Sequence, residues 1–416
     1  MARYTNLVFT FVINPCNAKD IESSSFLQSS FWAQFKSLAL WSANFFSVDV
    51  FLKKEKVCTF YCVVLLRKIF RFFSICYIPM MPPLLPILPN VKIFSDVDKA
   101  ENSSQSRVQN EQINQGEQSI NYAEYVSAFS DALAKNLDFS KKLQTSLLCI
   151  RYDFPLDFYS LEEKDSFIKK IIAFSKKKKL NIKKSKTDIQ PASTTVLDLK
   201  LSEDSLLQNM KSKWRYNIRL AQKKDVKIIV HNQNVSSEKD LGKALDIFYD
   251  LYKTTATRDG IAIHSKSYYR TLLLLKSENS KEDPRVNLYI AYSEEDALSA
   301  IITLFTKTEA IYLYGASSNI KRNFMSTYLL QWQAILDAKE YGSLHYDFYG
   351  IPPENDPHHP MYGLYLFKTG FGGKIIHRPG SFDIPLSPLY NLYALAENAR
   401  SFYHKRIKKI LAGRTK

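Results

Sequence analysis

The order of strand-like and helix-like segments between residues 286 and 351 limits the fold more than any other feature of the sequence. Three segments rich in Val, Ile, Leu and Tyr come first, at 286–292 and on both sides of a turn at 307–309. The apolar periodic segment 323–342 then predicts a helix, and "SLHYDFYGI" at 343–351 predicts a further strand. This order favours an α+β (mixed α/β) fold over an all-helical bundle.

An internal echo suggests that this unit occurs twice. "SLLCIRYDF" at 146–154 and "SLHYDFYGI" at 343–351 both open with Ser-Leu, contain Tyr-Asp-Phe, and follow a predicted helix. At 416 residues the chain is long enough for about two domains. Two copies of one mixed-sheet unit would account for this length.

The first half of the sequence contains further predicted elements. A serine-rich start at 23–25 predicts a capped helix whose Phe31, Phe35 and Leu38 share one inward face. Segments 45–54 and 56–70 predict paired strands around a charged turn. The polar segment at about 95–119 predicts a flexible insertion or surface loop.

The clearest predicted helix covers residues 202–228. Ser202 with two acidic neighbours supplies the expected N-terminal cap. One side carries an apolar stripe and another a basic stripe, each at helical spacing. The apolar stripe is Leu207, Met210, Trp214, Ile218 and Ala221, and the basic stripe is Arg215, Arg219, Lys223 and Lys227.

The charge balance favours polyanionic partners. Lys and Arg number 57 against 41 acidic residues, which gives a net charge of +16, and seven lysines fall within residues 175–186. Nucleic acid, anionic lipid head groups or a phosphorylated metabolite would fit this charge. A solvated basic surface is the plainer alternative.

Cysteine usage and hydropathy indicate a cytoplasmic protein. The five cysteines are odd in number and scattered through apolar runs, so we expect reduced thiols and no zinc site or other metal. The N-terminus is a poor secretory signal, and charges and prolines interrupt the longest apolar region. Any contact with the inner membrane surface would therefore be peripheral.

The glycine-rich stretch "GLYLFKTGFGGKI" at 363–375 is not a nucleotide cradle. It lacks the spacer and the Ser/Thr of a P-loop, and no Ser-His-Asp or Cys-His set stands out elsewhere. The chain fits better to transfer chemistry in which the substrate brings an activated carbonyl. Such chemistry requires a positive charge where the oxyanion develops, and Lys368, between aromatic residues, suits this role.

Six motifs in order resemble the Fem family (FemA, FemB, FemX) of aminoacyltransferases. They are "MKSKWRYNIRLAQKKDV", "YKTTATRDGI", "IYLYGASS", "YLLQWQAILDAKEYG", "YDFYGI" and "GLYLFKTGFGGKI". The resemblance implies transfer of an amino acid from an aminoacyl-tRNA to the stem-peptide amine of a peptidoglycan precursor, in cell-wall cross-bridge formation. The acceptor would be UDP-MurNAc-pentapeptide or lipid II, with no cofactor beyond aminoacyl-tRNA as co-substrate.

The resemblance also implies a domain plan. It predicts two GNAT-like (acyl-CoA N-acyltransferase-like) domains in a protein that we expect to be a monomer. The first would span 1–198 and be completed by 378–416, and the second would span 199–377. The short path between "RYNIRLAQKK" and "RDGI" leaves no room for the long coiled-coil arm of some members.

Site residues follow from the same resemblance. The catalytic Phe-Lys pair falls on Phe367 and Lys368, and the proposed acidic helper on Asp153. Substrate-binding positions match Lys36, Arg258 and Tyr314. Candidate tRNA contacts are Lys176, Lys177 and Lys178 in the lysine run and Arg215, Arg219 and Lys223 on the basic stripe.

Each of these residues also has a plain structural explanation. Lys368 could be the solvated end of a strand, Phe367 a core aromatic, and Arg258 a local ion pair with Asp259. Lys36 could be a helix-surface lysine and Asp153 a residue that caps a loop. Two other functions also remain open, an acyl-CoA-dependent N-acyltransferase and a non-catalytic RNA-binding protein.

Overall fold

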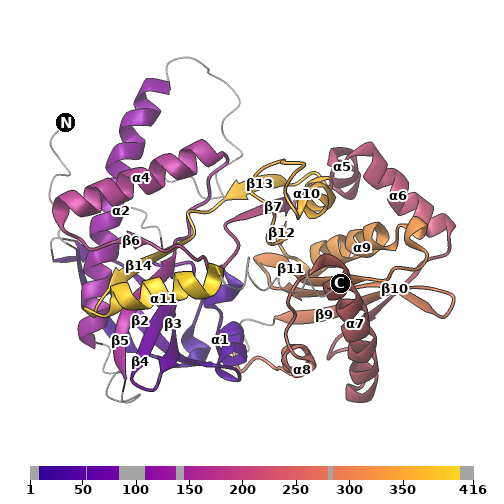
Figure 1. The fold of residues 1–416 in the computed structure, drawn as a ribbon, viewed down its shortest axis with the longest axis horizontal. Helices are drawn as coiled ribbons and strands as arrows, with labels where there is room; N and C mark the ends of the chain where they lie inside the picture. The colour runs from indigo at the N-terminus through magenta and orange to yellow at the C-terminus, as the bar shows by residue number, and fades with distance from the viewer. Residues whose placement is uncertain (1–8, 53, 84–107, 137–144, 280–283, 403–416) are drawn as a thin grey trace. The chain divides into compact units, whose positions relative to one another are not determined.

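The chain folds into two compact units, seen here in a computed structural model (Figure 1). The structure describes residues 9–52, 54–83, 108–136, 145–279 and 284–402. Unit 1 comprises Met1–Ser23, Leu40–Ala192 and His377–Lys416, and unit 2 comprises Ser24–Ala39 and Ser193–Ile376. The predicted division at residue 198 differs from these units, because the segment Ser24–Ala39 and the strand after Ala192 both cluster with unit 2.

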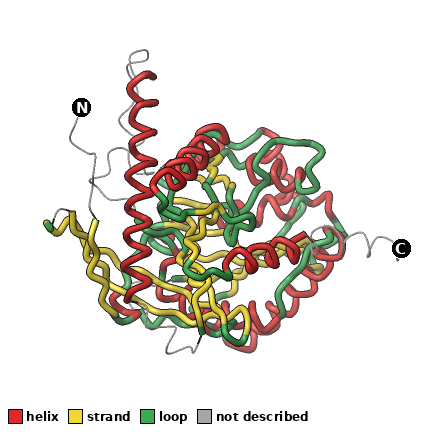
Figure 2. Tube along the Cα trace, turned by 60° about the vertical axis from the view of Figure 1, so that its left-hand side comes forward, coloured by secondary structure: helices red, strands yellow, loops and turns green. Residues whose placement is uncertain are grey.

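Unit 1 is a mixed sheet with helices packed against it. The long helix α2 runs beside the strands (Figure 2) and contacts β1 and α4. Phe9, Tyr125 and Phe129 belong to the buried core between them. The elements are β1 (Phe9–Pro15), β2 (Trp41–Leu52), β3 (Glu55–Phe70), β4 (Phe73–Ile78), α2 (Val108–Asn136), β5 (Ser146–Asp153), α4 (Leu161–Lys178), β6 (Lys183–Lys184), β14 (Ser381–Pro385) and α11 (Tyr390–Phe402).

Unit 2 places helices on both sides of its sheet. Helices α6 and α9 lie on one side and α7 and α8 on the other (Figure 1). The elements are α1 (Ser30–Ser37), β7 (Ser193–Asp198), α5 (Glu203–Asn209), α6 (Ser212–Lys223), β8 (Lys227–His231), α7 (Glu238–Asp259), α8 (Lys266–Leu274), β9 (Arg285–Ser293), β10 (Asp296–Phe305), β11 (Glu309–Ser317), α9 (Ser326–Tyr341), β12 (His345–Asp347), α10 (Tyr362–Thr369) and β13 (Lys374–His377).

The two sheets repeat one topology. In the described residues each has seven strands, ordered β1-β2-β3-β4-β5-β14-β6 in unit 1 and β8-β9-β10-β11-β12-β7-β13 in unit 2. In both, four antiparallel strands lead through a crossover helix to a parallel fifth strand. The echoed segments form those fifth strands, β5 and β12, so the duplication extends to strand order and direction.

Each sheet takes its sixth strand from the other half of the chain. In unit 1 this strand is β14, which follows β13 of the unit 2 sheet, and in unit 2 it is β7, which follows β6 of unit 1. Both sixth strands run antiparallel to the fifth. Neither sheet is therefore complete within one contiguous half of the sequence.

Helix ends follow local sequence signals. The Ser29 hydroxyl caps α1 by accepting from the Trp32 backbone N–H at 3.0 Å. Helix α7 ends at Gly260 and α9 at Gly342, with φ of 63° and 94°. A left-handed residue at this position is unstrained only for glycine, which explains both stops.

Three local predictions are wrong. The expected single helix 202–228 is two helices, α5 and α6, and Lys227 begins strand β8 instead of extending the basic stripe. Leu38, expected on an inward face, is 63% exposed because α1 ends before it. The predicted loop at 95–119 is helical from Val108 onwards as part of α2, and 95–107 lie outside the described residues.

The mixed α/β fold class is confirmed by these two sheets. Within the described residues of unit 2, the longest helix is α7 with 22 residues, and no pair of long antiparallel helices projects from the unit. Among the helices in the described ranges, none combines the length and the apolar character needed to cross a bilayer.

Candidate functional site

Lys368 is a buried cation at the end of α10. Only 7% of the residue is exposed, and its Nζ donates to the carbonyl oxygens of Tyr349 at 2.8 Å and Gly350 at 3.0 Å. The same Nζ lies 5.1 Å from the ring centroid of Tyr312. Burial lowers the pKa of Lys368 to about 7, opposed by the nearby charge of Asp347. Lys368 is therefore not the solvated end of a strand, which was its plain structural alternative.

The loop that receives Lys368 adopts an unusual backbone conformation. Tyr349 has φ of +56°, a left-handed conformation that non-glycine residues seldom adopt. Its N–H donates to Asp347 Oδ1 at 2.7 Å, and the same oxygen accepts from the Thr194 hydroxyl. The carboxylate of Asp347 therefore stabilises the turn whose carbonyl groups face the ammonium.

Phe367 belongs to the apolar core of unit 2 as well as flanking Lys368. Its ring packs against Tyr328 and Phe371, with centroids 5.2 and 5.4 Å away. The carbonyl oxygen of Phe367 accepts from Trp214 Nε1 at 2.9 Å, which joins α10 to α6. The interpretation of Phe367 as a core aromatic is therefore consistent with the structure, and its catalytic role stays a prediction.

The glycines that follow Lys368 permit close packing. A Cβ on Gly370 would lie 2.2 Å from a ring atom of Trp214. Gly372 has φ of +88°, and a Cβ there would lie 2.4 Å from the Asn209 carbonyl oxygen. Their positions are explained by a tight turn beside α5 and α6.

Strand β11 connects Lys368 to two of the predicted substrate-binding residues. It carries Tyr312 beneath the ammonium and, two residues on, Tyr314. The Tyr314 hydroxyl lies 3.2 Å from that of Tyr268, and Lys36 Nζ is 6.0 Å from the Tyr268 ring centroid. Lys36 also lies 5.1 Å from the Trp32 ring, so its cation faces aromatic side chains.

Arg258 reaches the far end of the same strand. Its Nη1 donates to the Ser317 carbonyl oxygen at 3.3 Å and to Asn319 Oδ1 at 3.1 Å. The expected local ion pair is also present, with Nε 2.9 Å from Asp259 Oδ1. The Arg258 guanidinium is therefore held by Asp259 and by the end of β11.

Sequence reasoning missed the residues that join these positions. Tyr312 and Tyr268 were not singled out, although "IYLYGASS" places tyrosines on alternate positions of a predicted strand. Asp347 belongs to the repeated Tyr-Asp-Phe sequence, but no role was predicted for it. For Tyr312 the available signal was this alternation of tyrosines, and for Asp347 it was a carboxylate at the end of a predicted strand. Tyr268 lies in helix α8, where no such signal marked it.

Asp153 lies in unit 1, at the end of β5. It is 5% exposed, and its carboxylate accepts from the hydroxyl groups of Tyr77 and Ser381. Burial raises the pKa of Asp153, while those two hydroxyls oppose the rise. Its acidic-helper role stays a prediction.

The predicted tRNA contacts are mostly exposed side chains, although Lys178 Nζ also lies 3.6 Å from Glu124 Oε1. Lys176, Lys177 and Lys178 are exposed in the last turn of α4, where cations interact favourably with the helix dipole. Arg219 and Lys223 are exposed on α6. Arg215 instead donates through Nη1 to the carbonyl oxygens of Leu207 and Gln208, both at 3.1 Å, and of Met210. Arg215 thereby caps α5.

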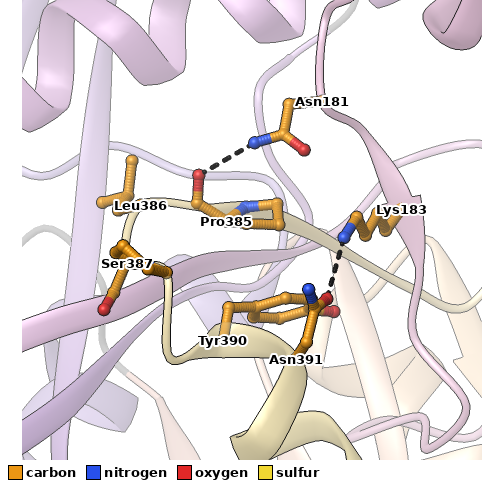
Figure 3. A pocket seen from close by; sticks show the side chains of 8 residues that line it. Asn181, Lys183, Pro385, Leu386, Ser387, Tyr390 and Asn391 are labelled. Atoms are coloured by element: carbon orange, nitrogen blue, oxygen red, sulfur yellow. Dashed lines mark hydrogen bonds between the residues drawn. The ribbon is translucent and has the colours of Figure 1, made fainter.

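A pocket of about 330 Å³ lies in unit 1, and none of the predicted site residues is among those that line it (Figure 3). It is lined by β6, the end of β14 and the start of α11.

No group of three or more His, Cys, Asp or Glu in the described residues could hold a metal ion. His358 and His359 follow Asp356, whose carboxylate accepts from the His358 N–H at 2.9 Å.

Comparisons with known proteins agree on one family. A profile described as the FemAB family matches residues 155–282 and 274–398. The "Lipid II:glycine glycyltransferase" of Staphylococcus epidermidis RP62A is 27% identical over 266 residues, and that of Staphylococcus aureus USA300 is 26% identical over 271. Each match covers 50% of this chain and 62% of the relative, less than two thirds of its length.

A solved structure shares the fold. The structure titled "Crystal structure of FemX" aligns over 91% of this chain and 96% of its own, with a TM-score of 0.61 and 20% identity.

Proposed function

Because the chain belongs to the FemAB family, we propose that it is an aminoacyltransferase. It transfers an amino acid from an aminoacyl-tRNA to the stem-peptide amine of a peptidoglycan precursor. The names of its relatives, which act on lipid II with glycine, support this reaction class and make glycine the first amino acid to test.

The observation that carries the proposal is the environment of Lys368. Two of its three N–H donors are held by backbone carbonyl groups, which leaves one for a ligand. With a pKa of about 7, the amine is neutral in about half of the molecules at neutral pH. An oxyanion that forms beside the Lys368 amine favours its protonated form. The amine is therefore more fully charged as the negative charge of the oxyanion develops.

The reaction itself needs little beyond positioning. The acceptor amine attacks the ester carbonyl, a C–N bond forms, and the C–O bond to the ribose breaks, with the proton from the amine passing ultimately to the ribose hydroxyl. Lys368 stabilises the oxyanion and Phe367 limits water around it. Asp153 keeps its predicted acidic-helper role, which burial supports by raising the pKa of its carboxyl group.

The remaining predicted residues bind the two substrates. Lys36, Arg258 and Tyr314, joined through β11, hold the diphosphate and sugar of UDP-MurNAc-pentapeptide or lipid II. The exposed lysines of α4 and the exposed part of the α6 stripe contact the tRNA backbone. No cofactor or metal takes part, and the need for aminoacyl-tRNA places the reaction in the cytoplasm.

The test is a reconstituted assay with mass spectrometry of the acceptor. Glycyl-tRNA is mixed with the purified chain and either the nucleotide-linked or the lipid-linked acceptor. We expect the acceptor to gain the mass of glycine, and uncharged tRNA to give no product. Lys368→Ala should lower turnover by about 10²–10³-fold. The matched control is Lys374→Ala, because Lys374 is an exposed lysine on β13.

Two outcomes would assign another function. RNA binding that persists in Lys368→Ala, with no product from any charged tRNA and either acceptor, indicates an RNA-binding protein. Acetyl-CoA binding at micromolar concentration with acetyl transfer indicates an acyl-CoA-dependent enzyme.

A further inference from the structure

Helix α11 is held on unit 1 by its inner face. Tyr390 and Tyr393 are buried, and Glu397 accepts two hydrogen bonds from the buried guanidinium of Arg151, both at 2.8 Å. These residues recur at helical spacing, so they define one side of the helix. That side is fully used by contacts within the unit.

The outer face of α11 is apolar and exposed. Leu392 and Leu395 are each 66% exposed, and Leu389, just before the helix, is 45% exposed. Ala396 and Ala399 are also exposed and continue the spacing i, i+3, i+4, i+7 from Leu392. Single exposed leucines are ordinary, whereas an acid-free row of them along one helix face marks an interaction surface.

A cationic pocket adjoins this row. The side chains of Lys183 and Asn391 meet across it, with Nζ 3.1 Å from Asn391 Oδ1, and Leu386 lies at its rim (Figure 3). Lys183 Nζ is also 5.1 Å from the Tyr390 ring centroid. A lysine with neighbouring amide and hydroxyl groups suits an anionic oxygen ligand of phosphodiester size.

We propose that this surface docks on an anionic phospholipid bilayer. The α11 row, which we define as Leu386, Leu389, Leu392 and Leu395, enters the interface while Lys183 binds a lipid phosphate. Charge favours this occupant over a second copy of the chain. The sequence that follows the helix, 403–416, contains six Lys or Arg and no acidic residue, and the whole chain carries +16.

Docking of this kind would bring the protein to a lipid-linked acceptor. That consequence rests on the proposed function, whereas the docking does not. The two can therefore be measured separately.

The test is co-sedimentation of the full chain with vesicles. Phosphatidylglycerol–phosphatidylcholine vesicles are compared with phosphatidylcholine vesicles alone at several salt concentrations. We expect binding to the anionic vesicles, weakened by salt. Leu392→Gln with Leu395→Gln, which keeps a good helix former at both positions, should reduce affinity at least tenfold. Lys183→Gln should weaken binding and flatten its salt dependence.

The matched control replaces Val235 and Ile320 by Gln, two exposed apolar residues of unit 2 that are 69% and 52% exposed. Equal binding by the α11 double variant and this control overturns the proposal, as does equal binding to both vesicle types. Self-association abolished by the α11 double variant, seen by size-exclusion chromatography, overturns it in favour of a dimer surface.

A second readout separates this inference from the proposed function. The α11 double variant should lose rate with the lipid-linked acceptor in vesicles and keep its rate with the nucleotide-linked acceptor. If the unsubstituted chain transfers to neither acceptor, the proposed function fails, and the vesicle result stands on its own.

Discussion

Arg151 and Asp383 face each other across neighbouring strands and form a bidentate pair. They are register partners on β5 and β14, with Nε 2.7 Å from Asp383 Oδ1 and Nη2 2.9 Å from Oδ2. Both residues are 1% exposed. Tyr390 also donates to Asp383 Oδ2 at 2.8 Å. The pair therefore joins the strand contributed by the far end of the chain to the sheet of unit 1.

We expect Asp383→Asn to destabilise the protein strongly. It would leave the buried Arg151 with Glu397 as its remaining carboxylate and remove one charge of the pair. Breaking a buried pair from one side costs about 3–5 kcal/mol. Chemical denaturation, followed by circular dichroism, gives the change in the free energy of unfolding.

The control for Asp383→Asn is an ion pair at the surface. Lys227 and Asp225 lie 2.6 Å apart with side chains 71% and 80% exposed. Asp225→Asn should change the free energy of unfolding by about 0–1 kcal/mol. Similar losses in the two variants would contradict a special role for the buried pair.

The stability of the protein should depend on pH through Lys368. Its pKa is about 7 in the folded state, against 10.5 for an unperturbed lysine. Between these values the unfolded chain binds more protons, so the Lys368 contribution to the free energy of unfolding rises with pH by up to about 1.4 kcal/mol per unit. Below about pH 7 both states are protonated, and the penalty for burying the charge is constant.

Lys368→Met isolates this effect because it keeps an unbranched apolar chain without the charge. We expect the stability of the unsubstituted chain, relative to Lys368→Met, to increase from pH 7 to pH 10. The exposed Lys374→Met should show no such trend. Parallel pH curves for the unsubstituted chain and Lys368→Met would show that the lysine is not buried as described.

Gly315→Ala should disturb Lys368 from a distance. A Cβ on Gly315 would lie 1.8 Å from the Tyr312 hydroxyl and 2.7 Å from its ring, so the ring beneath the ammonium must move. Overpacking of this kind costs about 1–3 kcal/mol. Adding Tyr312→Phe removes the nearest atom and should recover part of the loss. Denaturation of the single and double variants measures the loss of stability and its recovery. If the double variant recovers nothing, the Tyr312 hydroxyl is not the source of the strain.

The sequence predicted the elements whose ends are set locally. The apolar segment 323–342 predicted α9 closely, because Gly342 ends this helix. The serine cap of α1 was expected at 23–25, whereas Ser29 caps the helix, which ends before Leu38. The break between α5 and α6 was not predicted, because one of its causes is a distant backbone contact and the other a side chain that periodicity does not reveal. The Lys211 N–H donates to the Gly370 carbonyl oxygen at 2.9 Å, and Arg215 occupies the carbonyl groups that end α5.

The candidate site was also predictable only in part. Motif resemblance indicated Lys368, Tyr314, Lys36 and Arg258, but their connection runs through the register of β11 and the placement of α1 in unit 2. Such contacts join residues of different segments, 46 positions apart for Tyr268 and Tyr314 and far more for Lys36 and Tyr268, and no periodicity within a segment encodes them. The predicted domain plan assigned 378–416, which contains β14, to the first domain, but it did not anticipate that β7 joins the sheet of unit 2.

Substitution of the α4 lysines should reduce the salt dependence of tRNA binding. Lys176, Lys177 and Lys178 are exposed, and each phosphate that a lysine neutralises adds about 0.7–0.9 to the slope of log affinity against log salt. Replacing all three by Gln should therefore lower the slope by about 2–3, with little dependence on tRNA sequence. The control replaces the exposed Lys239, Lys243 and Lys276 of unit 2. A filter-binding titration at several salt concentrations measures the slope, and equal slopes in both triple variants would remove the α4 lysines from the tRNA-binding surface.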